Sequence, residues 1–233
     1  MCERMWKAAA RSLFDLCTPQ HAEKGQGDEG DRNQSGTASA PGSPRLPARA
    51  VPMGRTAVMP GQLPEVPAQP TPVDQHELRR VAGSFCSGVT VVAACGPGGP
   101  IGMTCQSFFS LSLDPPLIAF SPSKTSTTYP AIRTAGRFAV NILSAGQQWL
   151  AVQFACPGPD KWRGVHWSVG LGGSPVIRAA LAVIECRIEA EHDAGDHHLV
   201  VGRVLRMQHD ERRSPLVFYR SRFAGLSEAE RAV

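Results

Sequence analysis

The hydrophobic pattern changes from helical to strand-like after residue 88. Four apolar residues recur at the spacing i, i+3, i+4, i+7: Leu78, Val81, Ala82 and Phe85. This spacing is typical of an amphipathic helix. Asp74 precedes the pattern with Glu77 three positions later, which is the arrangement of a capping box. We therefore expect ordered structure to begin at Asp74 with a helix that ends at Gly88.

Beyond Gly88, most apolar runs are short and either continuous or alternating, which indicates strands. The expected strands cover residues 89–94, 101–113, 117–121, 137–143, 180–193, 198–210 and 215–223. Short helices are expected at 128–136, closed by Gly136, and at 145–155. Turn residues at 96–100 and 194–197 separate neighbouring strands, so both connections are expected to be hairpins. This order predicts a mostly β fold with peripheral helices, an antiparallel barrel rather than a doubly wound sheet.

Residues 1–72 differ in composition from the rest of the chain. They hold ten of the twenty prolines and a polar stretch without apolar periodicity. Such a segment buries too little surface to offset its ordering entropy, so residues 19–72 are predicted to be disordered. Residues 1–17 fit a short amphipathic helix but lack the apolar region of a secretory signal. The expected domains are a Pro/Gly-rich extension over 1–72, one folded domain over 73–227 and a tail over 228–233.

Composition narrows the classes of function. The chain has 233 residues, a net charge of +4 and only 19% charged residues, which does not fit a nucleic-acid-binding protein. No apolar stretch reaches the roughly 18 residues that span a bilayer, so no membrane is expected as a partner. The seven cysteines are scattered and odd in number, which indicates reduced thiols and a cytoplasmic protein.

Several nucleotide and hydrolase motifs are absent from the sequence. It contains no GxxxxGK[ST], GxGxxG, HExxH or GxSxG. GPGGPIG at 96–102 lies between two expected strands, so no helix follows to point its N-terminus at a pyrophosphate. A nucleotide cofactor would therefore be bound without a Rossmann unit.

Polar residues interrupt the expected strand in GMTCQSFFSLSLDPP, residues 102–116. Thr104, Gln106 and Ser107 stand in a strand that otherwise packs. Because alternate residues face opposite sides of a strand, one face could offer hydroxyl, amide and main-chain groups to a flat polar heterocycle. A half-exposed strand of an antiparallel sheet accounts for the same pattern.

The segment SPSKTSTTYP, residues 121–130, contains six Ser or Thr residues and one Lys. Ser126, Thr127 and Thr128 can cap a helix that begins near Tyr129. A helix N-terminus with hydroxyl groups and the Lys124 ammonium is also suited to bind a phosphate. A surface loop with an ordinary cap remains the alternative.

Three His and two Asp occur in HDAGDHH, residues 192–198. His197 and His198 are adjacent and would face opposite sides of a strand, and no matching Cys/His pair occurs elsewhere, so no metal is expected. A polar hairpin turn and a single His lining a ligand pocket both fit this segment.

Taken in order, seven blocks of the chain resemble the flavin reductase-like, FMN-binding split-barrel family. They are FCSGVTVV, IGMTCQSFFSLSLDPPLIAFSPSKTSTTYPAIR, GRFAVNILSAGQ, FACPGPDKWRGVHW, GSPVIRAALAVIECRI, HDAGDHHLVVGRV and PLVFYRSRFAGL. The resemblance covers residues 74–227 and is greatest to the reductase components of two-component flavin-dependent monooxygenases, of the steroid-ring or phenol type. It implies a six-stranded split β-barrel that forms a homodimer with flavin at the interface.

The resemblance also implies site residues. Flavin contacts are expected from Pro100, Ile101, Gly102, Met103, Thr104, Gln106, Ser107, Ser121, Pro122, Ser123, Lys124, Ser126, Thr128 and Lys161. The ribityl phosphate is expected at residues 121–128. His197 is expected beside the nicotinamide as the catalytic positioning group, and Phe218, Tyr219, Arg220 and Ser221 near the dinucleotide. Gln106 and Tyr219 differ from the Ser or Asn and the His that many family members have there.

The implied reaction is hydride transfer from NADH or NADPH to FMN or FAD, after which an oxygenase component receives the reduced flavin. In such a reaction the cofactors carry the chemistry and the protein positions them. Two alternatives remain from the sequence. One is a flavin- or haem-binding split-barrel protein without turnover. The other is an enzyme that retains FMN and reduces another acceptor, such as a ferric chelate.

Overall fold

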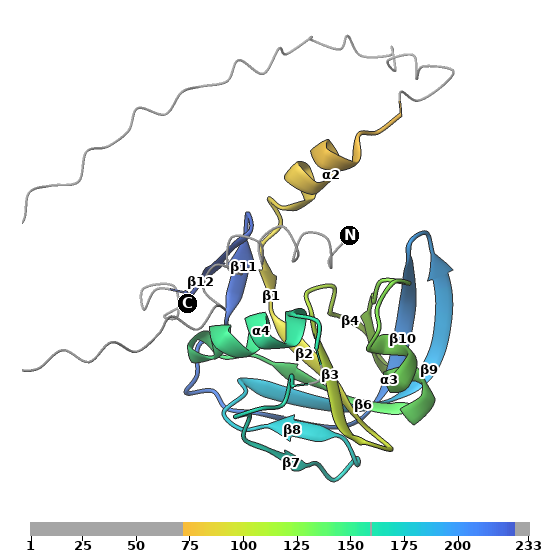
Figure 1. Cartoon of the computed structure of the whole chain (residues 1–233), viewed down its shortest axis with the longest axis vertical. Coiled ribbons are helices and arrows are strands. Elements are labelled where there is room, and N and C mark those ends of the chain that lie inside the picture. The colour runs from red at the N-terminus through yellow and green to blue at the C-terminus, as the bar shows by residue number, and fades with distance from the viewer. Residues whose placement is uncertain (1–71, 159, 227–233) are drawn as a thin grey trace, which may run out of the picture. The chain divides into compact units, whose positions relative to one another are not determined.

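An antiparallel sheet of seven strands forms the centre of the protein, in the order β3-β2-β6-β9-β10-β5-β4 (Figure 1). The structure is a computed structural model that describes residues 72–158 and 160–226. The predicted extension up to residue 71 and the tail 228–233 lie outside the described residues. The strands are β2 (Thr90–Gly96), β3 (Gly99–Cys105), β4 (Phe109–Leu113), β5 (Pro116–Phe120), β6 (Arg137–Ile142), β9 (Ala182–Ala194) and β10 (His197–His209).

The predicted fold class is confirmed, but the single strand expected over 101–113 is two strands. β3 pairs with β2 and β4 pairs with β5, so these consecutive strands lie at opposite edges of the sheet. Residues 106–108 carry the chain from one edge to the other. The main sheet in the described part of the chain therefore has seven strands instead of six. The Ser107 hydroxyl accepts from the Ser121 backbone N–H (2.8 Å) and donates to its carbonyl (3.0 Å), which fixes this crossing segment.

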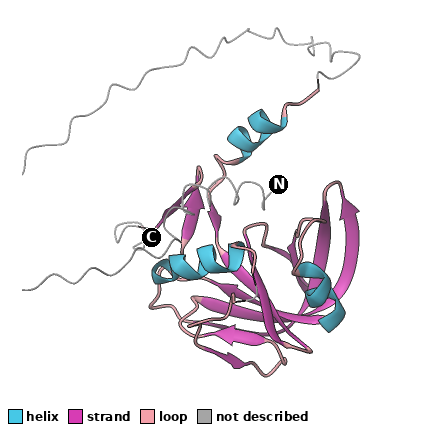
Figure 2. Ribbon diagram, in the orientation of Figure 1, coloured by secondary structure: helices cyan, strands magenta, loops and turns pink. Residues whose placement is uncertain are grey.

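Strand β2 is buried on both faces and divides the core into two clusters. Val91 and Ala93 pack in a cluster with Leu150 and Phe154 of α4 (Gln148–Ala155). Val92 and Ala94 pack on the other side, in a cluster that includes residues of α3 (Tyr129–Ala135). Figure 2 shows the two helices against the strands. The continuous apolar run expected as a strand is thus buried because a helix covers each side.

The long strands β9 and β10 form the predicted hairpin around the turn at Gly195, whose φ is +65°. Two register shifts interrupt their pairing, one at Val201/Gly202 and one at Val204/Arg206. Such bulges increase the local twist of a strand pair, and Figure 1 shows the hairpin strongly curved. The turn end of this hairpin lies against the segment that follows β5.

The last strand expected over 215–223 is also divided. β11 (Val217–Tyr219) and β12 (Arg222–Ala224) form a hairpin, with positive φ at Arg220 (46°) and Ser221 (63°). The short β1 (Ser87–Gly88) pairs with β11, which makes a separate three-stranded sheet. A two-stranded sheet of β7 (Trp167–Val169) and β8 (Pro175–Ile177) and a 3₁₀ turn at Ala145–Gln147 complete the described elements.

The first described helix, α2 (Gln75–Ala82), begins where the sequence predicts but ends earlier. The Asp74 carboxylate accepts from the backbone N–H groups of His76 and Glu77. Glu77 does not complete the capping box, because its carboxylate pairs with Arg80 at 2.6 Å. The helix ends at Gly83 rather than Gly88, since residues 87–88 pair with β11. None of its residues is buried, so its apolar face is exposed. No helix in the described ranges is long and apolar enough to cross a membrane.

Candidate functional site

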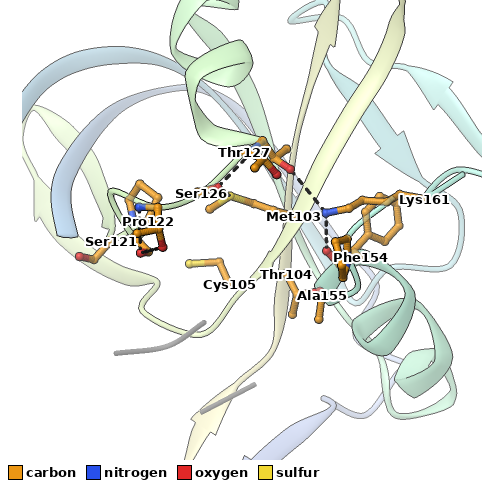
Figure 3. Close-up of a pocket in the computed structure, with 14 residues that line it drawn as sticks. Met103, Thr104, Cys105, Ser121, Pro122, Ser126, Thr127, Phe154, Ala155 and Lys161 are labelled. Carbon is orange, nitrogen blue, oxygen red and sulfur yellow. Dashed lines mark hydrogen bonds between the residues drawn. The ribbon is translucent and has the colours of Figure 1, made fainter. Parts of the chain in front are cut away.

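A pocket lined with hydroxyl groups lies between β3, the β5–α3 connection and the end of α4 (Figure 3). We call it the hydroxyl pocket. Its empty space is about 770 Å³, part of which is open solvent. Its lining residues are Met103, Thr104, Cys105, Ser121, Pro122, Ser123, Thr125, Ser126, Thr127, Thr128, Phe154, Ala155, Pro157 and Lys161.

The beginning of the Ser/Thr segment is attached to the β9–β10 turn. The Lys124 N–H donates to the Asp196 carbonyl and the His198 N–H donates to the Pro122 carbonyl, both at 2.9 Å. The Ser121 hydroxyl donates to the His198 carbonyl at 2.7 Å. These bonds fix residues 121–124 against β10, so the lining hydroxyls that follow have a rigid support.

Ser126 provides the helix cap that the sequence predicts. Its hydroxyl oxygen accepts from the backbone N–H of Tyr129 at 3.1 Å and of Thr128 at 3.3 Å. The same hydroxyl donates to the Met103 sulfur at 3.7 Å across the pocket. Ser126 therefore both caps α3 and lines the pocket. Thr128, the residue directly before α3, makes no side-chain cap.

The two lysines expected at the flavin lie in different environments. Lys161 lines the hydroxyl pocket, and its ammonium donates to the Phe154 carbonyl at 3.0 Å and to the Thr128 hydroxyl at 3.4 Å (Figure 3). Lys124 does not line the pocket; its Nζ lies 3.0 Å from Asp193 Oδ1. The hydrogen bond and charge of Lys124 lower the pKa of the Asp193 carboxyl. Of these two lysines, only Lys161 lines the hydroxyl pocket.

A second pocket, which we call the aromatic pocket, contains most of the residues expected near the dinucleotide. Gln106 and Ser107 line it together with Phe218, Arg220 and Ser221. The remaining lining residues are Ala82, Gly83, Phe85, Ser87, Phe108 and Phe109. Its lining is mostly apolar, with four phenylalanines, and such surfaces suit flat aromatic rings. Residues 105–107 connect its wall to that of the hydroxyl pocket.

Some predicted site residues line neither pocket. Pro100, Ile101 and Gly102 lie on β3, where Gly102 allows α4 to approach, since a Cβ there would be 2.8 Å from Phe154 Cε1. Tyr219 is 39% exposed on β11. His197 is buried, forms a β-bridge with Ser123, and shares a hydrogen bond of 2.7 Å between its Nδ1 and Asp196 Oδ1. The structure thus brings His197 to the Ser/Thr segment and not among residues 218–221.

Sequence reasoning missed several apolar lining residues of both pockets. Phe154, Ala155 and Pro157 come from the end of α4, and Phe85, Phe108 and Phe109 line the aromatic pocket. A helix of apolar residues predicts burial but not which pocket it borders. Only the FACPGPDK stretch, which breaks the helix directly before Lys161, could have indicated that this turn faces a ligand.

The hydroxyl pocket is built for binding rather than for nucleophilic chemistry. Its lining thiol, Cys105, is buried, and burial raises the pKa of this thiol. The thiol therefore stays protonated at neutral pH, and a protonated thiol is a poor nucleophile. Several hydroxyl donors and one ammonium together suit an anionic group such as a phosphate. In the described ranges, no group of three or more His, Cys, Asp or Glu side chains is arranged to hold a metal ion.

Comparisons with known proteins show the family to which the chain belongs. Residues 82–227 match the model of the flavin reductase like domain family. The reductase subunit HsaB of a flavin-dependent monooxygenase from Rhodococcus jostii is 42% identical over 154 residues, which are 66% of this chain and 79% of the relative. The FMN reductase (NADH) SmoA from Agrobacterium fabrum is 45% identical over 154 residues, 66% of this chain and 87% of the relative.

A solved structure shows the same fold. The NADH:FAD oxidoreductase SgcE6 from Streptomyces globisporus, in complex with NAD and FAD fragments, superposes with a TM-score of 0.64 at 36% identity. The match covers 66% of this chain and 94% of that chain.

Proposed function

The chain belongs to the flavin reductase like family, and on this premise we propose that it is an NAD(P)H:flavin oxidoreductase. It reduces FMN or FAD by hydride transfer and supplies the reduced flavin to a partner monooxygenase. The relatives named as a monooxygenase reductase subunit and as an FMN reductase support both halves of this proposal.

The observation that carries the proposal is the hydroxyl pocket. Ser123, Ser126 and Thr128 line it with Lys161, a set of donors that matches the phosphate and ribityl end of a flavin. Ser126 already accepts two backbone N–H groups, so its oxygen is fixed while its hydroxyl hydrogen faces Met103. Thioether sulfur is a weak acceptor, so a phosphate oxygen can take this donor at little cost.

The aromatic pocket is our candidate for the flat rings. Phe108 and Phe218 offer apolar surface, and the Gln106 amide adds hydrogen-bonding capacity at the same wall. We assign the isoalloxazine to the connection between the two pockets, the nicotinamide to the side of His197, and another part of the dinucleotide to the side of residues 218–221. When bound, the nicotinamide supplies a hydride from C4 and the flavin accepts it at N5. The chain contributes orientation and exclusion of water, which is what such a transfer requires of a protein.

His197 remains our proposed positioning group for the nicotinamide. Its bond to the Asp196 carboxylate through Nδ1 restrains the orientation of the imidazole ring. We expect His197→Ala to raise the KM for NADH about tenfold or more, in line with the loss of one fixed polar contact. Its KM for flavin should change little. An unchanged KM for NADH would exclude this role.

We also propose that the enzyme is a homodimer. Exposed apolar side chains occur on α2, on β4 and at the rim of the aromatic pocket: Leu78, Val81, Phe85, Phe109, Leu111 and Leu113. Phe85 is 81% and Leu113 89% exposed, and apolar surfaces of this kind mark protein interfaces. Light scattering after size exclusion should give twice the chain mass, and Leu113→Asp should shift it toward one chain. A monomeric wild type would contradict the proposal.

The five described cysteines are free thiols, which supports a cytoplasmic location.

The direct test of function is turnover. Purified protein should oxidise NADH with a rate that saturates in added FMN. A rate no higher than free flavin gives without protein would refute the reductase and leave a binding protein. Flavin that stays bound through purification would instead favour an FMN-retaining reductase of another acceptor.

A further inference from the structure

The segment that lines the hydroxyl pocket is attached to the β9–β10 hairpin at both of its ends. Its beginning is fixed by the backbone bonds of Pro122 and Lys124 described above. Its end is fixed by a side chain: the Tyr129 hydroxyl donates to Glu191 Oε2. Tyr129 is the first residue of α3 and Glu191 lies on β9. Residues between these two attachments carry the hydroxyls of Ser126, Thr127 and Thr128.

The carboxylate of Glu191 gathers three groups. Its Oε2 accepts from Tyr129, and its Oε1 lies 3.4 Å from the Arg133 guanidinium and 3.5 Å from His198 Nδ1. Tyr129 and Arg133 are one helical turn apart, so both lie on the same side of α3. One side chain on β9 therefore holds two side chains of α3, in addition to the core packing of that helix.

Tyr129 transmits this attachment to the pocket. Its side chain is 3% exposed and its ring packs against Phe120 at 6.2 Å and His198 at 5.6 Å between centroids. Its backbone N–H donates to the Ser126 hydroxyl oxygen. A shift of Tyr129 thus displaces the capped hydroxyl that lines the pocket. Burial and the hydrogen bond to Glu191 both raise the pKa of the Tyr129 hydroxyl, so it remains a donor throughout the neutral range.

We propose that Glu191 is a positioning residue for flavin binding, which acts through Tyr129 to hold the Ser126–Thr128 hydroxyls at the phosphate end of the ligand. The proposal rests on the reductase function above and deepens it. Glu191 itself does not line the hydroxyl pocket. Its loss should therefore affect affinity for the phosphate and leave the hydride transfer unchanged.

The test compares FMN with riboflavin, which lacks the phosphate, by titration of flavin fluorescence. Tyr129→Phe keeps the packing and removes only the hydroxyl; we expect it to raise the Kd for FMN about tenfold, since small displacements of positioning groups have effects of this order. The Kd for riboflavin should change less than about twofold. Glu191→Ala should raise the Kd for FMN by a similar factor. The double variant should raise this Kd no further than either single variant, because the two residues act as one unit. In turnover, the KM for FMN should rise at unchanged kcat.

Glu189→Gln is the matched control. Glu189 lies two residues away on β9 and pairs with Arg203 at 2.7 Å and Arg187 at 2.9 Å, both outside α3. The Glu189→Gln variant should leave the ratio of the Kd for FMN to the Kd for riboflavin unchanged. If Tyr129→Phe and Glu191→Ala lower only thermal stability and keep the wild-type ratio, the positioning role is excluded while the reductase stands. A wild type that binds both flavins equally would overturn the phosphate site itself and this inference with it.

Discussion

Replacement of Lys161 by methionine tests which cation neutralises the flavin phosphate. Both Lys161 and Lys124 are candidates from the sequence, but only Lys161 lines the hydroxyl pocket. Its Nζ is 3.4 Å from the Thr128 hydroxyl, so a phosphate held by that hydroxyl lies within reach of the ammonium. Methionine keeps the length and apolar stem of the side chain and removes the charge.

The expected loss follows from the kind of contact removed. A hydrogen bond to a charged group contributes about 1.5–3 kcal/mol, which corresponds to a rise in Kd for FMN of roughly tenfold to 150-fold. Riboflavin carries no phosphate, so its Kd should change less than about threefold. Since the pocket is open to solvent, salt screens part of the effect. The wild type should therefore lose more FMN affinity than Lys161→Met when the ionic strength is raised.

Lys124→Met is the matched comparison. The Lys124 ammonium pairs with Asp193, whose side chain is 80% exposed, and exposed ion pairs contribute only about 0–1 kcal/mol. We expect its effect on FMN to stay below about fivefold. Fluorescence titrations of both variants with both flavins decide the matter. A large FMN loss in Lys124→Met with none in Lys161→Met would refute the assignment, and so would equal losses for the two flavins.

Three further variants probe the scaffold. Gly102→Ala should lower the free energy of unfolding by about 1–3 kcal/mol in urea denaturation, because the added Cβ would lie 2.8 Å from Phe154. Gly98→Ala, where the added Cβ meets open space, should lower the free energy of unfolding by less. Asn141→Ala removes the buried amide that bonds three backbone groups, so we expect a loss of roughly 2–4 kcal/mol, and a wild-type midpoint would contradict this. Burial raises the pKa of Cys186 from 9.0 to about 12, so the unfolded chain loses this proton first and stability falls as pH rises from 9 to 12. Cys186→Ala should make that decline shallower, and an identical slope would show that the thiol does not contribute.

Local sequence pattern predicts the hairpins of this fold but not the edges of its sheet. The alternation in β9 and β10 and the turn at Gly195 are visible in the sequence because each is a local property. The division of residues 101–113 is not visible, since serine and apolar residues continue to alternate from Phe109 to Leu113 after the chain has left β3. What breaks the strand is the bond between Ser107 and Ser121, which joins positions that are distant in sequence.

The same distinction holds for the site. Residues 121–128 are contiguous, and their own hydroxyl groups suffice to predict them as a candidate ligand site. The helix cap at Ser126 also depends only on nearby residues. The partner of Lys124 is not predictable in this way, because Asp193 meets it only through the way residues 121–124 lie against the β9–β10 turn. Lys161 shows the reverse case. It is distant in sequence from residues 121–128, yet the turn after α4 places it in the wall of the pocket.

These contacts also explain why one segment can serve both as a helix cap and as a ligand site. A cap uses the oxygen of a hydroxyl group as an acceptor, and a bound anion uses its hydrogen as the donor. Ser126 accepts from two backbone N–H groups and directs its hydrogen at the Met103 sulfur. A phosphate oxygen would therefore replace the weak sulfur contact without competing for the cap. Because the two roles use different atoms of one hydroxyl, the polar segment before Tyr129 stabilises α3 and keeps its donors oriented toward the pocket.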